Sequence, residues 1–333
     1  MDISIITVTW NSAEHIAEQI SSVAHAAEGL AYEEIVIDNG STDSTVDIIK
    51  KNSPQIKIIT NQENKGFAAA NNQGYQEARG EFLLFLNPDM RFLETARLRP
   101  NENETTAPQG SLKKWVDWMR ARPHVGISGC KLVYEQTVTP NDPERARKGE
   151  SNGDEESLIL LSRVKSFLSD RRSEEDSFDH RQRSLSRPSR DRDDKIVYEF
   201  NQLARPRRFP TLFDQGMILL KIPHIFPSVL NKYLYTNFDP NTEQQVDSVR
   251  GSCMLARKEL LDKLGFAFDP RYYFWYEDVD ICKEAYGHGY TVFYTPIVSA
   301  VDYVGTSFRK RNIFWKQWQL LKSMAKYFQK WGI

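Results

Sequence analysis

The sequence predicts an α/β fold in which a mixed, mostly parallel sheet is flanked by helices. Two observations predict it. Within the first 90 residues, four apolar runs alternate with three helical patterns, which is typical of a parallel sheet covered on both faces. Apolar and aromatic density falls over residues 141–195 and returns after residue 200, so the second half is expected to complete the same core. At 333 residues the chain fits one large domain that carries an insertion.

The order of elements in the first half follows from local patterns. The expected strands are residues 3–10, 34–37, 56–60 and 82–86. Ser12 offers an N-cap to a first helix with apolar residues at Ile16, Ile20 and Val23. A short helix is expected after the turn-rich residues 38–43, and an alanine-rich helix after residue 66 that stops near Gly80.

Residues 141–195 differ sharply in composition from the rest of the chain. Of these 55 residues, 27 are charged and ten are serine, a composition that cannot bury much core. We expect a charged, partly disordered insertion here, with one short amphipathic helix at residues 158–168. A second polar stretch, residues 94–110, is expected to be a loop.

Composition and patterning exclude several classes of protein. Lys plus Arg total 44 against 45 for Asp plus Glu, so wholesale nucleic-acid binding is not expected. The first residues lack the pattern of an export signal, and no apolar stretch reaches the roughly 18–20 residues that cross a bilayer, so we expect a cytoplasmic protein. Cys130, Cys253 and Cys282 lie in apolar surroundings and are expected to be reduced core residues.

Residues 311–333 are predicted to form a C-terminal amphipathic helix. Within it, residues 314–331 mix aromatic and aliphatic side chains with lysines. One interpretation is peripheral contact with the inner face of the cell membrane. The other, which we favour, is a helix that closes the domain core, because such helices are common in soluble folds.

Polar side chains follow three of the predicted strands. Thr9 and Asn11 follow the first strand, Asp38 and Asn39 the second, and Asp89 the fourth. In open parallel sheets, ligands bind beyond the carboxyl ends of the strands, so these side chains are expected to line one crevice. The chain has neither G-x-G-x-x-G after the first strand nor a P-loop motif, which argues against a dinucleotide oxidoreductase or a P-loop enzyme.

A nucleotide would therefore have to be held by side chains. Asp38 suits a base N–H, and the two asparagines Asn11 and Asn39 suit base or ribose groups. Lys65 and Asn71 suit a phosphate or the sugar. For Asp43, binding and a purely structural role as a turn or helix cap remain equal alternatives.

Asp89 ends the sequence F-L-N-P-D at residues 85–89, so this carboxylate directly follows the end of an apolar strand. Such a group can hold Mg²⁺ or Mn²⁺ against a diphosphate. One carboxylate is sufficient, because Mg²⁺ completes its shell with phosphate oxygens and water. Taken alone, the motif is also an ordinary turn.

Three acids, Glu277, Asp278 and Asp280, follow a run of aromatic residues that begins at Tyr272. A carboxylate beside apolar rings is partly desolvated, so its pKa rises and it becomes a usable proton acceptor near neutral pH. We expect Glu277 and Asp278 to be the working pair. Asp280 is expected to be a solvated or capping acid, since helix starts favour acids.

Taken in order, these motifs resemble those of the family 2 glycosyltransferases, and most of all their rhamnosyltransferase-like bacterial branch. The chain reads V-T-W-N-S at residues 8–12, I-V-I-D-N-G-S-T-D at 35–43 and N-K-G-F-A at 64–68, followed by N-N at 71–72. After F-L-N-P-D it reads V-D at 246–247, G-S-C-M at 251–254 and Y-E-D-V-D-I-C at 276–282. Together the motifs cover the chain apart from its two polar insertions.

The resemblance implies a GT-A (Rossmann-like) fold, with residues 1–92 as the nucleotide-sugar-binding half and residues 200–310 as the acceptor and catalytic half. It implies a nucleoside diphosphate sugar donor, a divalent ion on Asp89, and Asp278 as the general base of one inverting displacement. Glu277 would orient the acceptor or tune Asp278. The donor-binding residues that it implies are Thr9, Asn11, Asp38, Asn39, Asp43, Asn64, Lys65, Gly66, Asn71 and Asp89.

The sequence departs from the family pattern near its C-terminus. The family has H-x-x-G-x-S, whereas this chain reads D-Y-V-G-T-S at residues 302–307. Asp302 can still bind a hard cation as a second metal ligand beside Asp89. It also adds negative charge near a diphosphate, so metal dependence is expected to be strict.

Two other functions are weaker alternatives. A sugar nucleotidyltransferase would carry a glycine-rich basic loop after the first strand, which this chain lacks. A non-catalytic sugar-nucleotide-binding or assembly protein on a degenerate GT-A fold is favoured by Asp302 but opposed by the intact Asp89, Glu277 and Asp278.

For the donor, the resemblance favours rhamnose on thymidine diphosphate, with galactofuranose, mannose and N-acetylhexosamines open. The expected acceptor is a surface polysaccharide or its lipid-linked precursor.

Overall fold

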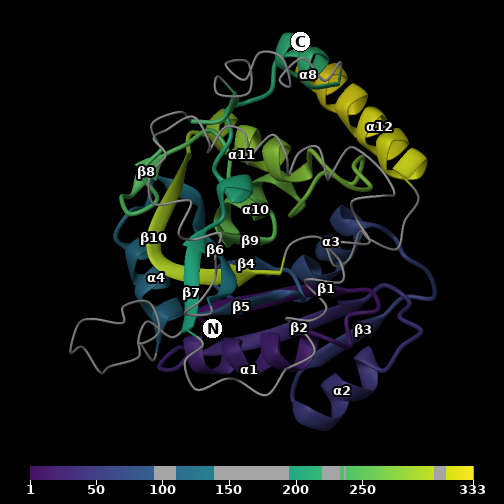
Figure 1. Cartoon of the computed structure of the whole chain (residues 1–333), viewed down its shortest axis with the longest axis vertical. Helices are drawn as coiled ribbons and strands as arrows, with labels where there is room; N and C mark the ends of the chain where they lie inside the picture. The colour runs from purple at the N-terminus through teal and green to yellow at the C-terminus, as the bar shows by residue number, and fades with distance from the viewer. Residues whose placement is uncertain (94–109, 139–194, 220–232, 236–237, 304–312, 333) are drawn as a thin grey trace.

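The structure is a computed structural model, and it describes residues 1–93, 110–138, 195–219, 233–235, 238–303 and 313–332 (Figure 1). The insertion expected at residues 141–195 lies outside the described residues apart from Lys195, and so does the helix expected at residues 158–168. The loop expected at residues 94–110 also lies outside them apart from Gly110.

Strands and helices alternate through the first half of the chain, as the sequence predicts. The elements are β1 (Ile3–Thr9), α1 (Ile16–Ala26), β2 (Tyr32–Asp38), α2 (Thr45–Asn52), β3 (Lys57–Thr60), α3 (Phe67–Glu77) and β4 (Phe82–Leu86). β1 pairs in parallel with β2 and with β4, and β2 pairs in parallel with β3. The carboxyl ends of β1, β2 and β4 therefore lie at the same edge of the sheet.

The remaining elements extend this sheet. They are β5 (Met90–Phe92), α4 (Ser111–Arg120), β6 (Val125–Val138), β7 (Lys195–Phe200), the short 3₁₀ helix η2 (Gln202–Ala204), α8 (Leu212–Leu219), β8 (Gln244–Gln245), β9 (Cys253–Arg257), α10 (Lys258–Leu264), α11 (Glu277–Gly287), β10 (Thr291–Asp302) and α12 (Ile313–Trp331). Within the described residues the strand order is β3-β2-β1-β4-β9-β6-β10-β5, with β7 beside β6 and β8 beside β10. β9 is antiparallel to β4 and β6, whereas β10 is parallel to β6, so the sheet is mixed.

Helices cover both faces of the sheet, because strand side chains alternate between the two faces. In β4, Leu83 and Phe85 belong to a core cluster with α3, α10 and α11. Phe82 and Leu84 belong to a second cluster with α1 and α4 on the opposite face. A wholly apolar strand such as β4 is what burial on both faces requires.

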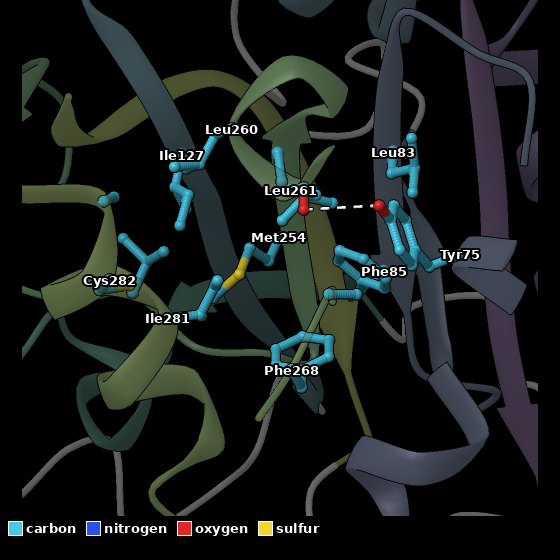
Figure 2. Close-up of a cluster of buried hydrophobic side chains, with 14 of the residues drawn as sticks. Tyr75, Leu83, Phe85, Ile127, Met254, Leu260, Leu261, Phe268, Ile281 and Cys282 are labelled. Carbon is cyan, nitrogen blue, oxygen red and sulfur yellow. Dashed lines mark hydrogen bonds between the residues drawn. The ribbon is translucent and has the colours of Figure 1, made fainter. Parts of the chain in front are cut away.

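The cluster on the α3 side joins the two halves of the chain (Figure 2). Met254 from β9 lies in it together with Phe85 from β4, and the ring of Phe268 contacts that of Phe85 edge to face with a centroid distance of 4.8 Å. Tyr75 of α3 donates a hydrogen bond from Oη to the carbonyl oxygen of Leu261 in α10 at 3.4 Å. Both halves therefore share one core.

The prediction that Ser12 caps α1 is wrong. The N-cap is His15, and no side chain caps the helix. The carbonyl oxygen of Ser12 accepts hydrogen bonds from the N–H groups of His15 and Ile16, which forms a turn ahead of the helix. The backbone N–H of Ser12 donates to Oγ1 of Thr45 at 2.8 Å, and its Oγ accepts from the N–H of Trp10 at 3.4 Å. These contacts hold Ser12 in the loop beside α2.

The cysteines and the C-terminal helix both contribute to the core. The three cysteines are buried and free, although Sγ of Cys130 lies only 3.3 Å from Sγ of Cys253. In α12, Tyr327 and Phe328 are buried, so the helix does close part of the core. None of the described helices is both long enough and apolar enough to cross a membrane.

Candidate functional site

The polar side chains predicted at the strand ends lie at one edge of the sheet. Thr9 at the end of β1 pairs with Asp38 at the end of β2, and β4 runs parallel on the other side of β1. Both side chains are buried, and Oγ1 of Thr9 donates to Oδ1 of Asp38 at 3.1 Å. This edge is where open α/β sheets bind ligands.

Asp38 fixes the loop that follows β2. The backbone N–H of Ser41 donates to Oδ2 of Asp38 at 3.0 Å, and Oγ of Ser41 donates to its Oδ1 at 2.5 Å. Asn11, in the left-handed conformation with φ of 54°, accepts from the N–H of Thr42 at 2.8 Å. Its own N–H donates to Oγ of Ser41 at 2.8 Å. The loops after β1 and β2 therefore form one bonded unit.

Asn39 joins this unit to the loop before α3. Its Nδ2 donates to the carbonyl oxygen of Gly66 at 3.3 Å, and its Oδ1 accepts from Nδ2 of Asn61 at 3.0 Å. Oδ1 of Asn64 accepts from the N–H of Gly66 at 2.9 Å, which closes a tight turn in which Gly66 has φ of 87°. Lys65 is exposed in this turn. The structure thus brings Asn39, Asn64, Lys65 and Gly66 together.

Asp43 and Asn71 make contacts with the protein backbone. Asp43 accepts from the N–H of Thr45 at the start of α2 at 3.0 Å and from that of Ala13 at 3.2 Å. Ser44 is the N-cap of α2, so these bonds of Asp43 stabilise the turn ahead of the helix, a structural role that the sequence left open beside binding. Asn71 is buried, and its Nδ2 donates to the carbonyl oxygen of Phe67 in its own helix at 3.0 Å.

Asp89 and Asp302 form a pair of neighbouring carboxylates. Asp302 ends β10, and the N–H of Tyr303 donates to the carbonyl oxygen of Asp89 at 3.3 Å. Removal from water, and then the negative charge of Asp89, raise the pKa of Asp302 to about 6. Nδ2 of Asn201 donates to Oδ2 of Asp302 at 3.4 Å. A cation would relieve the repulsion between the two carboxylates.

The donor set of this pair fits a hard cation such as Mg²⁺ or Mn²⁺, which prefer oxygen ligands. Among the described residues, no group of three or more His, Cys, Asp or Glu side chains is arranged to hold a metal. Two carboxylates suffice when phosphate and water oxygens complete the shell. The rest of the D-Y-V-G-T-S motif, residues 304–307, lies outside the described residues.

Arg250 is a residue of this region that the motif analysis missed, although it directly precedes the G-S-C-M motif. Burial and the neighbouring Arg207 lower the pKa of Arg250 to about 10, whereas the charges of Asp302 and Asp278 oppose this effect. Backbone hydrogen bonds of 3.2 and 3.1 Å between Arg207 and Ser248 hold the two arginine segments side by side. A guanidinium between two acidic regions is suited to bind an anionic ligand.

The backbone that leads into α11 is strained. Trp275 and Tyr276 have φ of 66° and 69°, and α11 begins at the next residue. Among the described residues, positive φ at a non-glycine position is found at Asn11, Trp275 and Tyr276. Such conformations cost about 1–3 kcal/mol each and concentrate at functional sites. The strain therefore marks the loop after β1 and the start of α11 as parts of a site.

Glu277 and Asp278 occupy the first turn of α11 but have different surroundings. Glu277 is buried, and burial, followed by the charge of Asp278, raises the pKa of Glu277 well above its usual range. Burial therefore favours the protonated form of the Glu277 carboxyl group. Asp278 accepts from the N–H of Gly251 at 3.4 Å and from that of Val279 at 2.9 Å.

The prediction of Asp280 as a solvated or capping acid is wrong. Its side chain is fully buried, and it accepts hydrogen bonds from Nζ of Lys330 at 2.6 Å, Nε1 of Trp331 at 2.8 Å and Oη of Tyr272 at 3.2 Å. Lys330 and Trp331 lie 50 and 51 residues further along the chain, so no local pattern indicates them. Asp280 therefore joins α11 to α12.

Segments of the chain are similar to known glycosyltransferases. Residues 4–100 match the family model described as Glycosyl transferase family 2. Dolichol-phosphate mannosyltransferase from Pyrococcus furiosus is 31% identical over 93 residues, which cover 27% of this chain and 26% of that protein. Poly(ribitol-phosphate) beta-glucosyltransferase from Bacillus spizizenii is 33% identical over 150 residues, which cover 40% of this chain and 24% of that protein.

The whole fold is similar to that of a solved mannosyltransferase. PcManGT from Pyrobaculum calidifontis, in complex with GDP-Man and Mn²⁺, matches with a TM-score of 0.50 at 16% identity, covering 98% of this chain and 64% of that one. At this identity the likeness shows the fold, which is of the GT-A type. The residues that match the glycosyl transferase family 2 model, 4–100, include strands β1 to β5 of this fold. The matched segments span about a quarter of the length of the two curated relatives.

Proposed function

We propose that this chain is an inverting, metal-dependent glycosyltransferase that moves a sugar from a nucleoside diphosphate to a hydroxyl group of a polysaccharide or of its lipid-linked precursor. The observation that carries the proposal is the position of Arg250, which lies near both Asp302 and Asp278. Asp302 in turn neighbours Asp89 at the strand-end site. Arg250 thus lies near both the Asp89–Asp302 pair, which suits a metal-bound diphosphate, and Asp278, which suits proton removal.

The nucleotide is proposed to bind at the loops after β1 and β2. Asp38 uses three acceptor positions, one for Thr9 and two for Ser41. A carboxylate offers about four such positions, so one remains for a base N–H. The exposed Lys65, in the turn to which Asn39 is bonded, supplies positive charge for a phosphate.

Asp89 and Asp302 are proposed to hold Mg²⁺ or Mn²⁺. When bound, the ion would neutralise negative charge on the departing diphosphate. Arg250, next to Asp302, would add charge-assisted hydrogen bonds to the diphosphate oxygens. The two carboxylates keep their negative charge when a cation is present, because the cation favours the ionised form.

Asp278 is proposed as the general base. It would remove the proton of the acceptor hydroxyl as the oxygen attacks the anomeric carbon of the sugar. Glu277, whose protonated form is favoured by burial, would orient the acceptor or tune Asp278. Attack from the face opposite the diphosphate inverts the sugar carbon in one step, so no covalent enzyme intermediate forms.

The identity of the donor is the finer part of the proposal. The sequence motifs favour rhamnose on thymidine diphosphate, whereas the two curated relatives described above are a mannosyltransferase and a glucosyltransferase. The experiment that tests the donor therefore compares nucleoside diphosphates with three different bases. Binding of uridine, thymidine and guanosine diphosphates is measured by calorimetry with and without Mg²⁺ or Mn²⁺.

The wild type is expected to bind one of these nucleotides in a metal-dependent manner. Asp89→Ala is expected to lose the metal-dependent part of the affinity. Asp117→Ala removes an exposed acid of α4 that pairs only with surface charges, so this control should bind as the wild type does. Failure of all three nucleotides to bind under every condition would overturn the donor site and favour a non-catalytic protein.

Arg250→Met tests the diphosphate contact separately. Hydrogen bonds to charged groups contribute about 1.5–3 kcal/mol, so the variant is expected to bind the nucleotide about 10- to 150-fold more weakly. Arg122→Met is the matched control, because Arg122 pairs with Glu243 on the surface. Unchanged affinity of a folded Arg250→Met variant would remove Arg250 from the donor site.

A further inference from the structure

One face of α12 packs against the rest of the protein. Tyr327 and Phe328 are buried in a cluster that also contains Tyr276. Oγ of Ser323 donates to the carbonyl oxygen of Phe274 at 2.7 Å. These contacts explain why the helix is apolar on the face that closes the core.

The opposite face of α12 is exposed and is apolar as well. Residues 314, 318, 321 and 325 are spaced by three or four positions, so they lie along one stripe of the helix. On this stripe Phe314 is 77% exposed, Trp318 57% and Leu321 38%. A helix that only closes a core carries polar residues on its outer stripe. Core packing therefore does not account for these side chains.

A neighbouring helix, α8, adds to the same kind of surface. Leu212 is 54% exposed and Phe213 65%. Both helices contact Tyr276, α8 through Gln215, which accepts from its Oη at 2.8 Å, and α12 through Tyr327, whose ring lies 5.3 Å from that of Tyr276. Figure 1 shows both helices at the end of the molecule away from β2 and β3. Five of the seven large apolar side chains exposed among the described residues belong to them.

The charge around these side chains is positive. α12 carries four lysines and no acidic residue, although Lys330 is 11% exposed and pairs with Asp280, Asp269 and Glu284, so it adds little positive charge to the surface. Lys322 is exposed, and its Nζ lies 5.2 Å from the ring centroid of Trp318. The one acid of α8, Asp214, is buried and accepts a hydrogen bond from Oγ1 of Thr211 at 2.7 Å. The chain as a whole has a net charge of −1, so this positive charge is local.

We propose that α8 and α12 form a docking surface for a lipid bilayer that contains anionic headgroups. The surface is defined by Leu212, Phe213, Phe314, Trp318 and Leu321. Aromatic and aliphatic side chains beside lysines are typical of helices that lie in the membrane interface. Lysines near an anionic surface strengthen binding, whereas an uncharged partner would gain nothing from them.

Membrane binding at the docking surface does not depend on the proposed function. Only its connection with a lipid-linked acceptor rests on that function. The ion pair between Lys330 and Asp280 connects α12 directly to α11, which carries Asp278. A bilayer bound at α8 and α12 would hold α11 close to the lipid. A lipid-linked saccharide acceptor in that bilayer would then lie near α11.

Cosedimentation of the full chain with lipid vesicles, without any donor, tests the surface. Vesicles are made of phosphatidylcholine alone or of phosphatidylcholine mixed with phosphatidylglycerol. The wild type is expected to bind the mixed vesicles more strongly. The triple variant Phe314→Ser, Trp318→Ser, Leu321→Ser should lower the partition coefficient at least about tenfold, because it removes the apolar area that enters the interface.

Two further variants sharpen the test. Lys316→Glu with Lys322→Glu should weaken binding to the mixed vesicles but change binding to phosphatidylcholine little, since it reverses the charge that attracts anionic headgroups and leaves the exposed apolar side chains in place. Ile297→Ser is the matched control, because Ile297 is an exposed apolar residue of β10, outside the proposed surface. It should bind vesicles as the wild type does.

Three outcomes would overturn the surface. The first is absence of vesicle binding by the wild type, and the second is full binding by the triple variant. The third is a dimer of the wild type in sedimentation velocity that the triple variant does not form, because a second copy of the chain would then cover these helices. Nucleotide affinity is measured on the same samples. Loss of vesicle binding with intact nucleotide binding concerns the surface alone, whereas absence of nucleotide binding concerns the proposed function alone.

Discussion

Nζ of Lys330 lies 2.6 Å from Oδ2 of Asp280, and this ion pair joins the last turn of α12 to the first turn of α11. Asp280 is fully buried, and the Lys330 side chain is 11% exposed. Lys330 also lies 2.9 Å from Oδ2 of Asp269 and 2.7 Å from Oε1 of Glu284. Because Asp278 lies in the same first turn, the position of the proposed base depends on the C-terminal helix.

Lys330→Met is expected to destabilise the protein by about 3–5 kcal/mol, because it leaves the buried Asp280 without its cation. Chemical denaturation at neutral pH measures the effect. Lys57→Met is the control, since Lys57 and Glu77 form an exposed pair and such pairs contribute at most about 1 kcal/mol. Equal destabilisation of the two variants would mean that the Lys330 pair does not fasten α12 to α11.

Glu34 is expected to make stability depend on pH. Burial raises its pKa from 4.5 to about 7 in the folded protein. Below pH 4.5 the carboxyl is protonated in both states, so its contribution to stability is fully present there. Between pH 4.5 and about 7 the unfolded chain ionises first, so stability is lost by up to about 3 kcal/mol.

Glu34→Gln removes this titration. Its free energy of unfolding, relative to that of the wild type, should therefore rise from pH 4.5 to pH 7 and stay constant above that range. Urea titrations at several pH values measure the difference. Glu14→Gln, at an acid whose side chain is 69% exposed, serves as the control and should show no such rise. A difference that does not change with pH would show that Glu34 is solvated.

The first half of the fold could be predicted from the sequence because its signals are local. The bounds predicted for β4 are those that the structure gives, because a wholly apolar run of five residues between Glu81 and Asn87 is typical of a buried strand in an α/β protein. The loop after β2 was recognised for the same reason: its turn residues are contiguous with the strand that ends at Asp38.

The parts that could not be predicted depend on distant segments. The role of Asp280 comes from Lys330 and Trp331 in another helix, and that of Arg250 from Asp302 and Asp278, which belong to two other elements. Local spacing carries no information about such pairs. A buried acid and a solvated acid look alike at the start of a helix until its packing partner is known.

Gly66→Ala is expected to weaken donor binding and to destabilise the protein by about 1–3 kcal/mol, because Gly66 has φ of 87°. A Cβ at this position would lie 2.6 Å from the carbonyl oxygen of Tyr273, which accepts the N–H of Phe67 at 2.9 Å. The turn would have to move, and its hydrogen bond from Asn39 would be lost. Calorimetry and thermal unfolding measure the two effects.

Gly287→Ala is the matched control for that substitution. Gly287 ends α11 with no positive φ, and a Cβ there would meet no atom within 4 Å. A gain of about 0.5–1 kcal/mol is expected, because alanine restricts the unfolded chain. If Gly66→Ala were as harmless as this control, the turn that contains Lys65 would not be held by its glycine.

Asp278→Asn and Glu277→Gln separate the roles of the two adjacent acids. Asparagine cannot take up a proton, so Asp278→Asn is expected to lower kcat about 10²–10⁴-fold while nucleotide affinity stays unchanged. Glutamine imitates the protonated form that burial favours for Glu277, so Glu277→Gln should retain activity within about tenfold of the wild type. Transfer from the donor identified by calorimetry gives kcat for both variants. If Glu277→Gln lost as much activity as Asp278→Asn, Glu277 would have to ionise during the reaction, and the base would be the buried acid rather than its neighbour.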